Sequence, residues 1–137
     1  MMRYGRVAIL LLAFSHSTAW ACGHCVEDRI AAVYDHALIL STQARKQQIA
    51  YFAWDGALAR DQASRLKLLT LIDDTPGVDK GSTHLSMEPA AFAVVFDPRR
   101  SSGPALEAAL RNKLRAMKVS VYLLQPPSQA PPSNKRY

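Results

Sequence analysis

Residues 48–54 read Gln48-Ile-Ala-Tyr-Phe-Ala-Trp54, a run of aromatic and aliphatic side chains with no charged residue. Such a run is typical of a central β-strand that other elements cover. The dipeptide Asp55-Gly56 follows and ends the strand. The sequence therefore predicts a buried strand over residues 48–54, around which the remaining elements must pack.

Five further elements follow this strand, and each is indicated by its own periodicity and flanking turn residues. A three-and-four spacing of apolar residues marks the helices, and alternation marks the strands. They are, in order, a helix with the stripe Ala59, Ala63, Leu66, Leu69 and Ile72, an edge strand at residues 82–88, a central strand at residues 91–96, a helix opened by Ser102-Gly103-Pro104, and a strand at residues 119–124.

The order strand, helix, strand, strand, helix, strand is that of the α+β ferredoxin-like βαββαβ sandwich. In that fold the first and third strands are central and the other two are edges, which agrees with their apolar and half-polar patterns. An additional helix is predicted ahead of the first strand, from Val26 to about Lys46. Its apolar stripe consists of Val26, Ile30, Val33, Tyr34, Ala37 and Leu38.

The two ends of the chain differ from the middle. Arg3 and Arg6, the apolar run at residues 7–14 and the small residues up to Ala21 have the pattern of a secretory signal peptide over residues 1–21, cut before Cys22. The apolar run is too short for a bilayer, which takes about 20 apolar residues, so no membrane-spanning segment is expected after cleavage. We expect an exported, periplasmic domain over residues 22–125 and a disordered proline-rich tail over residues 126–137.

Composition restricts the possible functions. The chain has 137 residues, which suits one domain, and removal of the leader leaves 15 of its 17 basic residues against 11 acidic ones. That near balance gives no support for nucleic-acid binding. Two cysteines exclude a disulfide-dense scaffold and a zinc site closed by four thiolates of this chain. No phosphate loop or catalytic triad is evident, so an enzyme is not favoured.

Three stretches carry a family resemblance: Leu69-Thr-Leu-Ile-Asp-Asp-Thr-Pro-Gly-Val78, Phe92-Ala-Val-Val-Phe-Asp-Pro98, and the alanine- and leucine-rich residues 102–113. Over about residues 49–124 the chain resembles a heavy-metal-associated domain, the ferredoxin-like module of copper chaperones, mercury-binding periplasmic proteins and metal-pumping ATPases. That family carries a Cys-x-x-Cys between its first strand and first helix. In this chain that loop is Asp55-Gly-Ala-Leu58, and the Cys-x-x-Cys lies at the N-terminus instead.

The displaced motif is Cys22-Gly-His-Cys25, directly ahead of the first predicted helix. Two thiols three residues apart at a helix start can share a metal ion, and the helix dipole favours their thiolate form. Soft thiolates select monovalent copper, for which the pair suffices. Four-coordinate zinc requires further ligands, such as His24 or a group from a partner. We therefore predict a metal site of Cys22, His24 and Cys25, with copper as the first candidate and zinc, nickel or mercury as alternatives.

Cleavage before Cys22 adds a second way to bind metal. The new α-amine, two backbone amides and the imidazole of His24 would then provide four nitrogens in a row. Such nitrogens can surround divalent copper or nickel in a square plane. One short segment would thus hold oxidised copper through nitrogens and reduced copper through sulfurs.

Two other interpretations of the cysteine pair remain open. Cys-Gly-His-Cys also occurs in protein disulfide isomerases, so the protein could exchange thiols and disulfides in the periplasm. Alternatively, a Cys22–Cys25 disulfide could be structural, which would leave a non-catalytic interaction domain with no metal. For the metal-binding interpretation, the expected partner is a metal transporter or another copper protein. The sequence does not indicate the oligomeric state.

Overall fold

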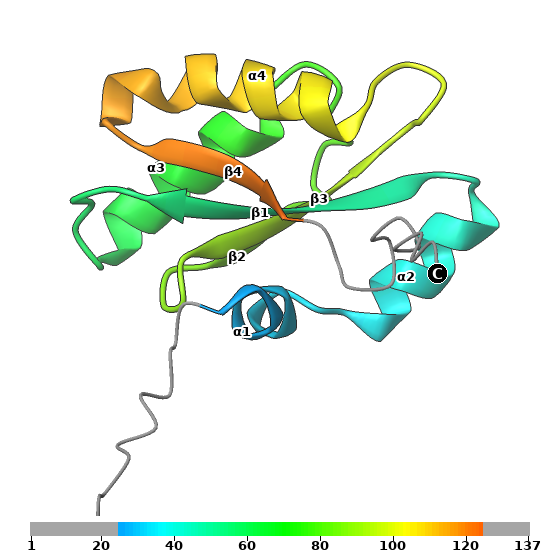
Figure 1. Cartoon of the computed structure of the whole chain (residues 1–137), viewed down its shortest axis with the longest axis horizontal. Helices are drawn as coiled ribbons and strands as arrows, with labels where there is room; N and C mark the ends of the chain where they lie inside the picture. Colours follow the sequence, from blue (N-terminus) through cyan, green and yellow to red (C-terminus); the bar gives the residue numbers. More distant parts are fainter. Residues whose placement is uncertain (1–24, 125–137) are drawn as a thin grey trace, which may run out of the picture.

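The computed structural model describes residues 25–124, and its strands form one antiparallel sheet in the order β2-β3-β1-β4. From β1 onward the element order is βαββαβ with β1 and β3 in the centre, so the predicted ferredoxin-like α+β fold is confirmed (Figure 1). The elements are α1 (Val26–Ala32), α2 (His36–Ala44), β1 (Gln48–Asp55), α3 (Gln62–Asp73), β2 (His84–Ser86), β3 (Ala91–Phe96), α4 (Gly103–Leu114), the 3-10 turn η1 (Arg115–Met117) and β4 (Ser120–Leu124).

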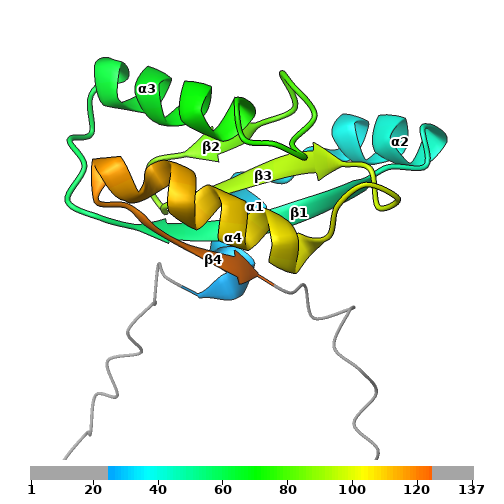
Figure 2. The same cartoon turned by 90° about the horizontal axis from the view of Figure 1, so that it is seen from above.

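Helices cover both faces of the sheet. The crossover helices α3 and α4 lie on one face, and α1 and α2 lie on the other (Figures 1 and 2). Side chains of the two central strands alternate between these faces, as a pleated strand requires. Phe52 and Phe92 belong to the core under α3 and α4, whereas Ala91 and Ala93 pack with Val33 at the end of α1. The domain is therefore a three-layer arrangement with one large and one small core.

The large core lies between the sheet and the two crossover helices. The rings of Phe52 and Phe92 stack with centroids 5.1 Å apart, and Trp54 is fully buried while its Nε1 donates to the Ser86 carbonyl at 3.2 Å. Met87 and Met117 pack against this core, as expected of core methionines rather than metal ligands. Its fully buried helix residues are Leu68 and Ile72 of α3 and Leu106, Leu110 and Leu114 of α4.

The predicted single helix over residues 26–46 is wrong, because the structure has two short helices there. Helix α1 ends at Ala32, and α2 begins after Asp35, whose carboxylate accepts the Leu38 N–H at 3.0 Å. A carboxylate in this position satisfies an N–H that a new helix start would leave without a partner. Of the predicted stripe, Val33 is buried, whereas Val26 and Tyr34 are exposed.

The predicted face of α3 is wrong in part. Ile72 is fully buried, as the predicted stripe requires, but Leu66 of that stripe is 51% exposed and Leu68, which is not in it, is fully buried. Ala59, also in the predicted stripe, lies ahead of the helix. Apolar residues stand at positions 66, 68, 69, 71 and 72, so two overlapping stripes satisfy helical spacing. The helix begins at Gln62 after the cap Asp61, whose carboxylate accepts the Ser64 N–H at 2.7 Å.

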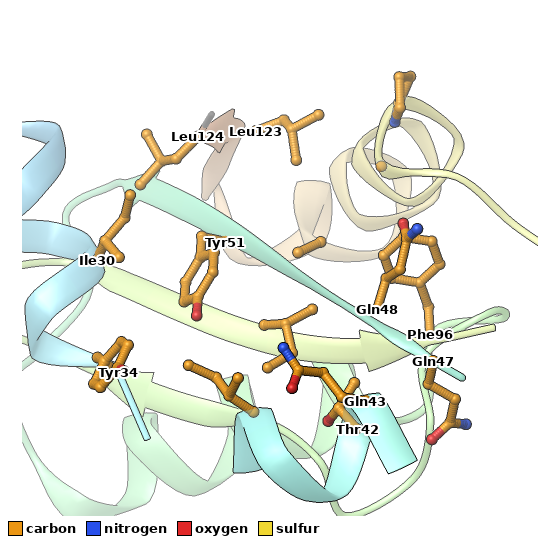
Figure 3. A pocket seen from close by; sticks show the side chains of 15 residues that line it. Ile30, Tyr34, Thr42, Gln43, Gln47, Gln48, Tyr51, Phe96, Leu123 and Leu124 are labelled. Carbon is orange, nitrogen blue, oxygen red and sulfur yellow. The ribbon is translucent and has the colours of Figure 1, made fainter. Parts of the chain in front are cut away.

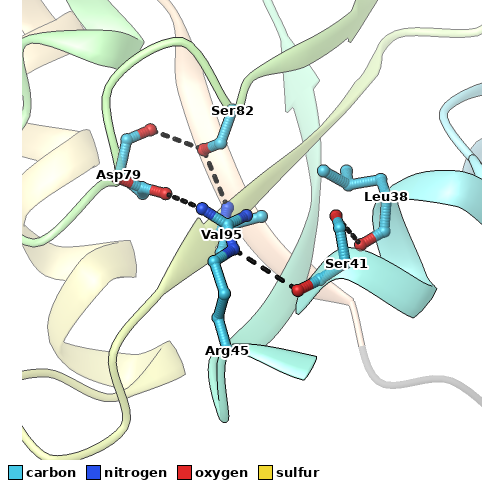
Figure 4. A network of polar contacts seen from close by, with 6 residues as sticks. All are labelled: Leu38, Ser41, Arg45, Asp79, Ser82 and Val95. Atoms are coloured by element: carbon cyan, nitrogen blue, oxygen red, sulfur yellow. Dashed lines mark hydrogen bonds and ion pairs between the residues drawn. The ribbon is translucent and has the colours of Figure 1, made fainter. Parts of the chain in front are cut away.

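The edge strand β2 is shorter than the predicted residues 82–88. Only residues 84–86 pair with β3. Ahead of them, a side chain replaces the backbone as the hydrogen-bond partner of β3. The Ser82 hydroxyl accepts the Val95 N–H at 3.0 Å and donates to the Asp79 carbonyl at 2.6 Å (Figure 4). Arg45 of the α2 C-terminal end reaches the Asp79 carboxylate at 3.4 Å and joins this turn to α2.

Other local predictions hold. Ser102 caps α4 by accepting the Ala105 N–H at 3.2 Å, with Pro104 in the first turn. Among residues 25–124, none of the helices has the length and apolar character needed to cross a bilayer. The leader at residues 1–21, the start of the domain at residue 22 and the tail at residues 126–137 lie outside the described residues and stay predictions.

Candidate metal site

Cys25 is the member of the predicted metal site that the structure describes. It is exposed and occupies the N-cap position of α1 in an extended conformation, with its carbonyl accepting the Arg29 N–H at 3.1 Å. Glu27 and Asp28 follow in the first turn and are both exposed. The thiol therefore stands at the surface, where a metal ion or a partner protein can approach it. Cys22 and His24 lie outside the described residues.

An ion pair places Cys25 relative to the sheet. Arg29, one helical turn from Cys25, has its guanidinium Nη2 3.6 Å from Oδ1 of Asp55, the last residue of β1. The Arg29 side chain is only 11% exposed, so α1 holds it against the domain. Helix α1 starts on the side of the sheet where β1 ends (Figure 1). Cys25 thus lies at the end of the sheet that also carries the β1–α3 loop, although it comes from another segment.

The β1–α3 loop itself, Asp55-Gly-Ala-Leu58, contains no metal-binding thiol. Gly56 fits a close approach there, since a Cβ at this position would lie 3.0 Å from the Lys118 carbonyl oxygen. Further along, the guanidinium carbon of Arg60 lies 5.5 Å from the centre of the Trp54 ring. The loop is therefore packed by backbone contacts and by an arginine over an aromatic ring.

Other candidate ligands are dispersed over the described part of the chain. Within residues 25–124, no three His, Cys, Asp or Glu side chains come together as a group that could hold a metal ion. His36 is exposed at the start of α2. His84 has Nδ1 3.8 Å from the Asp35 carboxylate, which links β2 to the α1–α2 connection.

The sequence gives no indication of a groove between the N-terminal helices and the sheet. This helix–sheet groove has a volume of about 780 Å³ and is lined by residues that include Tyr34, Thr42, Gln47, Tyr51 and Leu124. Burial, followed by the neighbouring Tyr34, raises the pKa of the Tyr51 phenol above its ordinary 10.0. In Figure 3, Tyr51 of β1 and Gln43 of α2 point into the space between the sheet and the helices.

Comparisons with known proteins concern the fold. The sequence matches no protein-family model and no curated protein. Among solved structures, oxidised MerP from Ralstonia metallidurans CH34 aligns over 58% of this chain and 99% of its own, with 19% identity and a TM-score of 0.45. The apo N-terminal domain of the zinc(II) ATPase ZiaA aligns over 66% of this chain and 76% of its own, with 14% identity and a TM-score of 0.44.

A third similar structure is the N-terminal domain of a potential copper-translocating P-type ATPase from Bacillus subtilis, determined in its Cu(I)-loaded state. It aligns over 56% of this chain and 86% of its own, with 16% identity and a TM-score of 0.42. The predicted similarity to heavy-metal-associated domains is thus found among solved structures. At these identities the similarity is one of fold, and the chemistry of this chain rests on its own residues.

Proposed function

We propose that this protein is an exported carrier of a soft transition-metal ion, copper first, which it binds through Cys22, His24 and Cys25 for transfer or sequestration. The observation that carries the proposal is the position of Cys25, exposed at the end of the sheet and held there by the Arg29–Asp55 ion pair. A second thiol three residues earlier in sequence completes a two-sulfur donor set. Two thiolates suffice for monovalent copper, and they favour it over harder ions.

The surroundings of Cys25 suit a metal cation that is carried as cargo. The carboxylates of Glu27 and Asp28 follow in the exposed first turn, and negative charge near a site favours a cation. Within residues 25–124 no other cluster of ligands competes for the ion. Metal binding therefore depends on the segment that ends at Cys25, and the sheet and helices serve to present it.

Transfer requires that a second protein can reach the metal. An exposed, two-sulfur site can pass copper to a partner by exchanging one thiolate at a time, with no net change in the copper oxidation state. The expected partner is a metal transporter or another copper protein outside the cytoplasm, which follows from the predicted leader at residues 1–21. His24 and the new α-amine at Cys22 would bind the oxidised ion.

Monovalent copper affinity, measured by competition with a chromophoric chelator under reducing conditions, tests the proposal. In the chain that starts at Cys22, Cys25→Ser should weaken copper binding by at least about 100-fold, since losing even an outer-shell partner of a metal ligand costs about 10–100-fold. His36→Ala, at an exposed histidine on α2, is the matched control and should leave the affinity unchanged. Equal affinities of Cys25→Ser and the parent chain would exclude the proposed site.

Divalent copper provides the second arm of the test. His24→Ala should abolish the visible absorption of a square-planar nitrogen complex, and His84→Ala should keep it, because His84 faces Asp35 instead. If the reduced protein takes up no copper yet reduces a substrate disulfide, thiol exchange is its function. If it does neither, the cysteine pair is structural.

A further inference from the structure

The helix–sheet groove has polar atoms that lack partners. The Thr42 hydroxyl is buried, with only 2% of the residue exposed, and it has no hydrogen-bond partner within residues 25–124. Oε1 of Gln47 is likewise buried there without a partner. Both residues line the groove. Because buried polar groups are almost always paired in folded proteins, their arrangement indicates a missing polar partner with both donors and acceptors.

The chemistry of the groove is that of a site for an uncharged extended chain. Its lining carries no charged side chain and combines the rings of Tyr34 and Tyr51 with three glutamines. Grooves lined by aromatic residues bind proline-rich segments in the polyproline II conformation. Such segments offer many carbonyl acceptors and few N–H donors, because proline has no N–H. The Tyr and Gln side chains supply the hydrogen-bond donors that such a chain needs.

This chain carries a segment of that kind directly next to the groove. Leu124, the last residue of β4, lines the groove, and residues 125–134 that follow read Gln125-Pro-Pro-Ser-Gln-Ala-Pro-Pro-Ser-Asn134 without a charge. Four of the seven residues from 126 to 132 are proline, and Ser128 to Ala130 between them retain N–H groups. N–H groups are the kind of partner that Gln47 Oε1 lacks.

The segment is long enough to cross the groove. Seven residues of polyproline II span about 22 Å at about 3.1 Å per residue. The groove residues of β1 run from Gln48 to Tyr51, which is about 10 Å at about 3.3 Å per residue. Because the segment starts at the groove, docking it costs little loop-closure entropy.

We propose that the helix–sheet groove is the docking site for residues 126–132 of the same chain. The segment cannot form a core of its own, which is why its composition predicts disorder, but it can add to the small core beneath α1 and α2. Docking would cover the part of the sheet face that borders the groove. It would also give the Thr42 hydroxyl and Gln47 Oε1 hydrogen-bond partners. The proposal is independent of metal binding, since no residue of the groove belongs to the cysteine motif.

Nuclear Overhauser contacts in the isotope-labelled chain starting at Cys22 test this docking. We expect contacts between the ring protons of Tyr51 or Tyr34 and the side-chain protons of Pro126, Pro127, Pro131 or Pro132. A mixture of labelled and unlabelled protein distinguishes contacts within one chain from contacts between two chains. Contacts only between chains would show that a second copy's tail fills the groove, and would overturn the proposal, as would the absence of any contact.

Variants at exposed tyrosines provide the control. Tyr34 is 55% exposed and Tyr122, outside the groove lining, is 46% exposed, so neither truncation should unfold the domain. Tyr34→Ala should move the proline resonances towards their values in a free peptide of residues 125–137, and Tyr122→Ala should not. Methyl resonances of Leu68 and Leu110 report on the large core. Equal proline shifts in the two variants, with intact core methyls, would contradict the proposal.

Discussion

The guanidinium of Arg29 in α1 lies 3.6 Å from the carboxylate of Asp55 at the end of β1. This contact ties a helix of seven residues, too short to be stable alone, to the end of the sheet. It also explains how a cysteine that precedes the ferredoxin-like unit in sequence comes to the end of the sheet where the β1–α3 loop lies. The position of the proposed metal site therefore depends on tertiary contacts of α1 with β1 and β3.

Asp55→Asn should loosen α1 while changing global stability little. The Asp55 side chain is 59% exposed, and exposed ion pairs contribute about 0–1 kcal/mol. We expect faster amide hydrogen exchange in α1 at an almost unchanged free energy of unfolding. Glu88→Gln, which breaks the more exposed Arg60–Glu88 pair at 3.0 Å, is the control and should leave exchange in α1 as it was. Unchanged α1 exchange in Asp55→Asn would mean that other contacts alone hold the helix.

Two leucines of α3 test which face of this helix is buried. Leu68→Ala should lower the free energy of unfolding by about 2–5 kcal/mol, the range for a buried leucine, because Leu68 is fully buried. Leu66→Ala, at a leucine that is 51% exposed, should change it by less than about 0.5 kcal/mol. Denaturant unfolding followed by circular dichroism measures both. A larger loss of unfolding free energy in Leu66→Ala than in Leu68→Ala would instead support the apolar stripe that was predicted from the sequence.

Acid stability should depend on Asp97. Its carboxylate accepts hydrogen bonds from the Arg99 side chain at 3.1 and 3.0 Å and from the Arg99 N–H at 2.9 Å, and these bonds lower the pKa of Asp97 below the ordinary 3.8. A lowered folded-state pKa means that the unfolded state binds the proton first. The stabilisation is therefore present above pH 3.8 and is lost as the pH falls through the lower folded-state value.

The Asp97 effect can be measured as the slope of unfolding free energy against pH. Asp97→Asn should make this slope shallower below pH 4, and the same sign is expected for Asp61, whose pKa the Ser64 backbone and side-chain hydrogen bonds lower. A slope that Asp97→Asn leaves identical to the parent would refute this assignment.

Tyr51 should govern part of the alkaline behaviour. Burial, and then Tyr34, raises the pKa of its phenol above 10.0, so the unfolded state releases this proton at a lower pH than the folded state does. The associated stability is complete below pH 10 and is lost as the pH rises through the folded-state value. Phenolate absorbance should show one late-titrating tyrosine that Tyr51→Phe removes and Tyr122→Phe does not. Loss of the late step in Tyr122→Phe instead would contradict the burial of Tyr51.

The central strands and their order follow from the sequence because their signals are local and strong. Residues 48–54 and 91–96 carry apolar residues on both alternating faces, which is typical of central strands covered on at least one side. The break at Asp35 was not predicted, since Asp35 occupies a position that a continuous helix could also tolerate. Asp35 can act as the N-cap of α2 because α1 has already ended, with Val33 packed on Ala91 and Ala93 of β3.

The groove could not be predicted for a related reason. It forms where α1, α2, β1 and the end of β4 meet, and no single segment carries its pattern. Ser82 is a similar case, because the sequence alternation continues through it while its side chain replaces the strand's backbone as the partner of Val95. At the groove and at Ser82, tertiary packing selects one of several local structures that the sequence pattern allows equally.

Native mass spectrometry of the mature protein from the exported fraction tests the metal-carrier proposal most directly, because it records the N-terminal residue, the thiol state and the bound metal together. The proposal predicts a chain that starts at Cys22 and holds one copper ion, and that loses the ion when Cys25 is replaced by serine. A closed Cys22–Cys25 disulfide that still takes up no copper after reduction would contradict it.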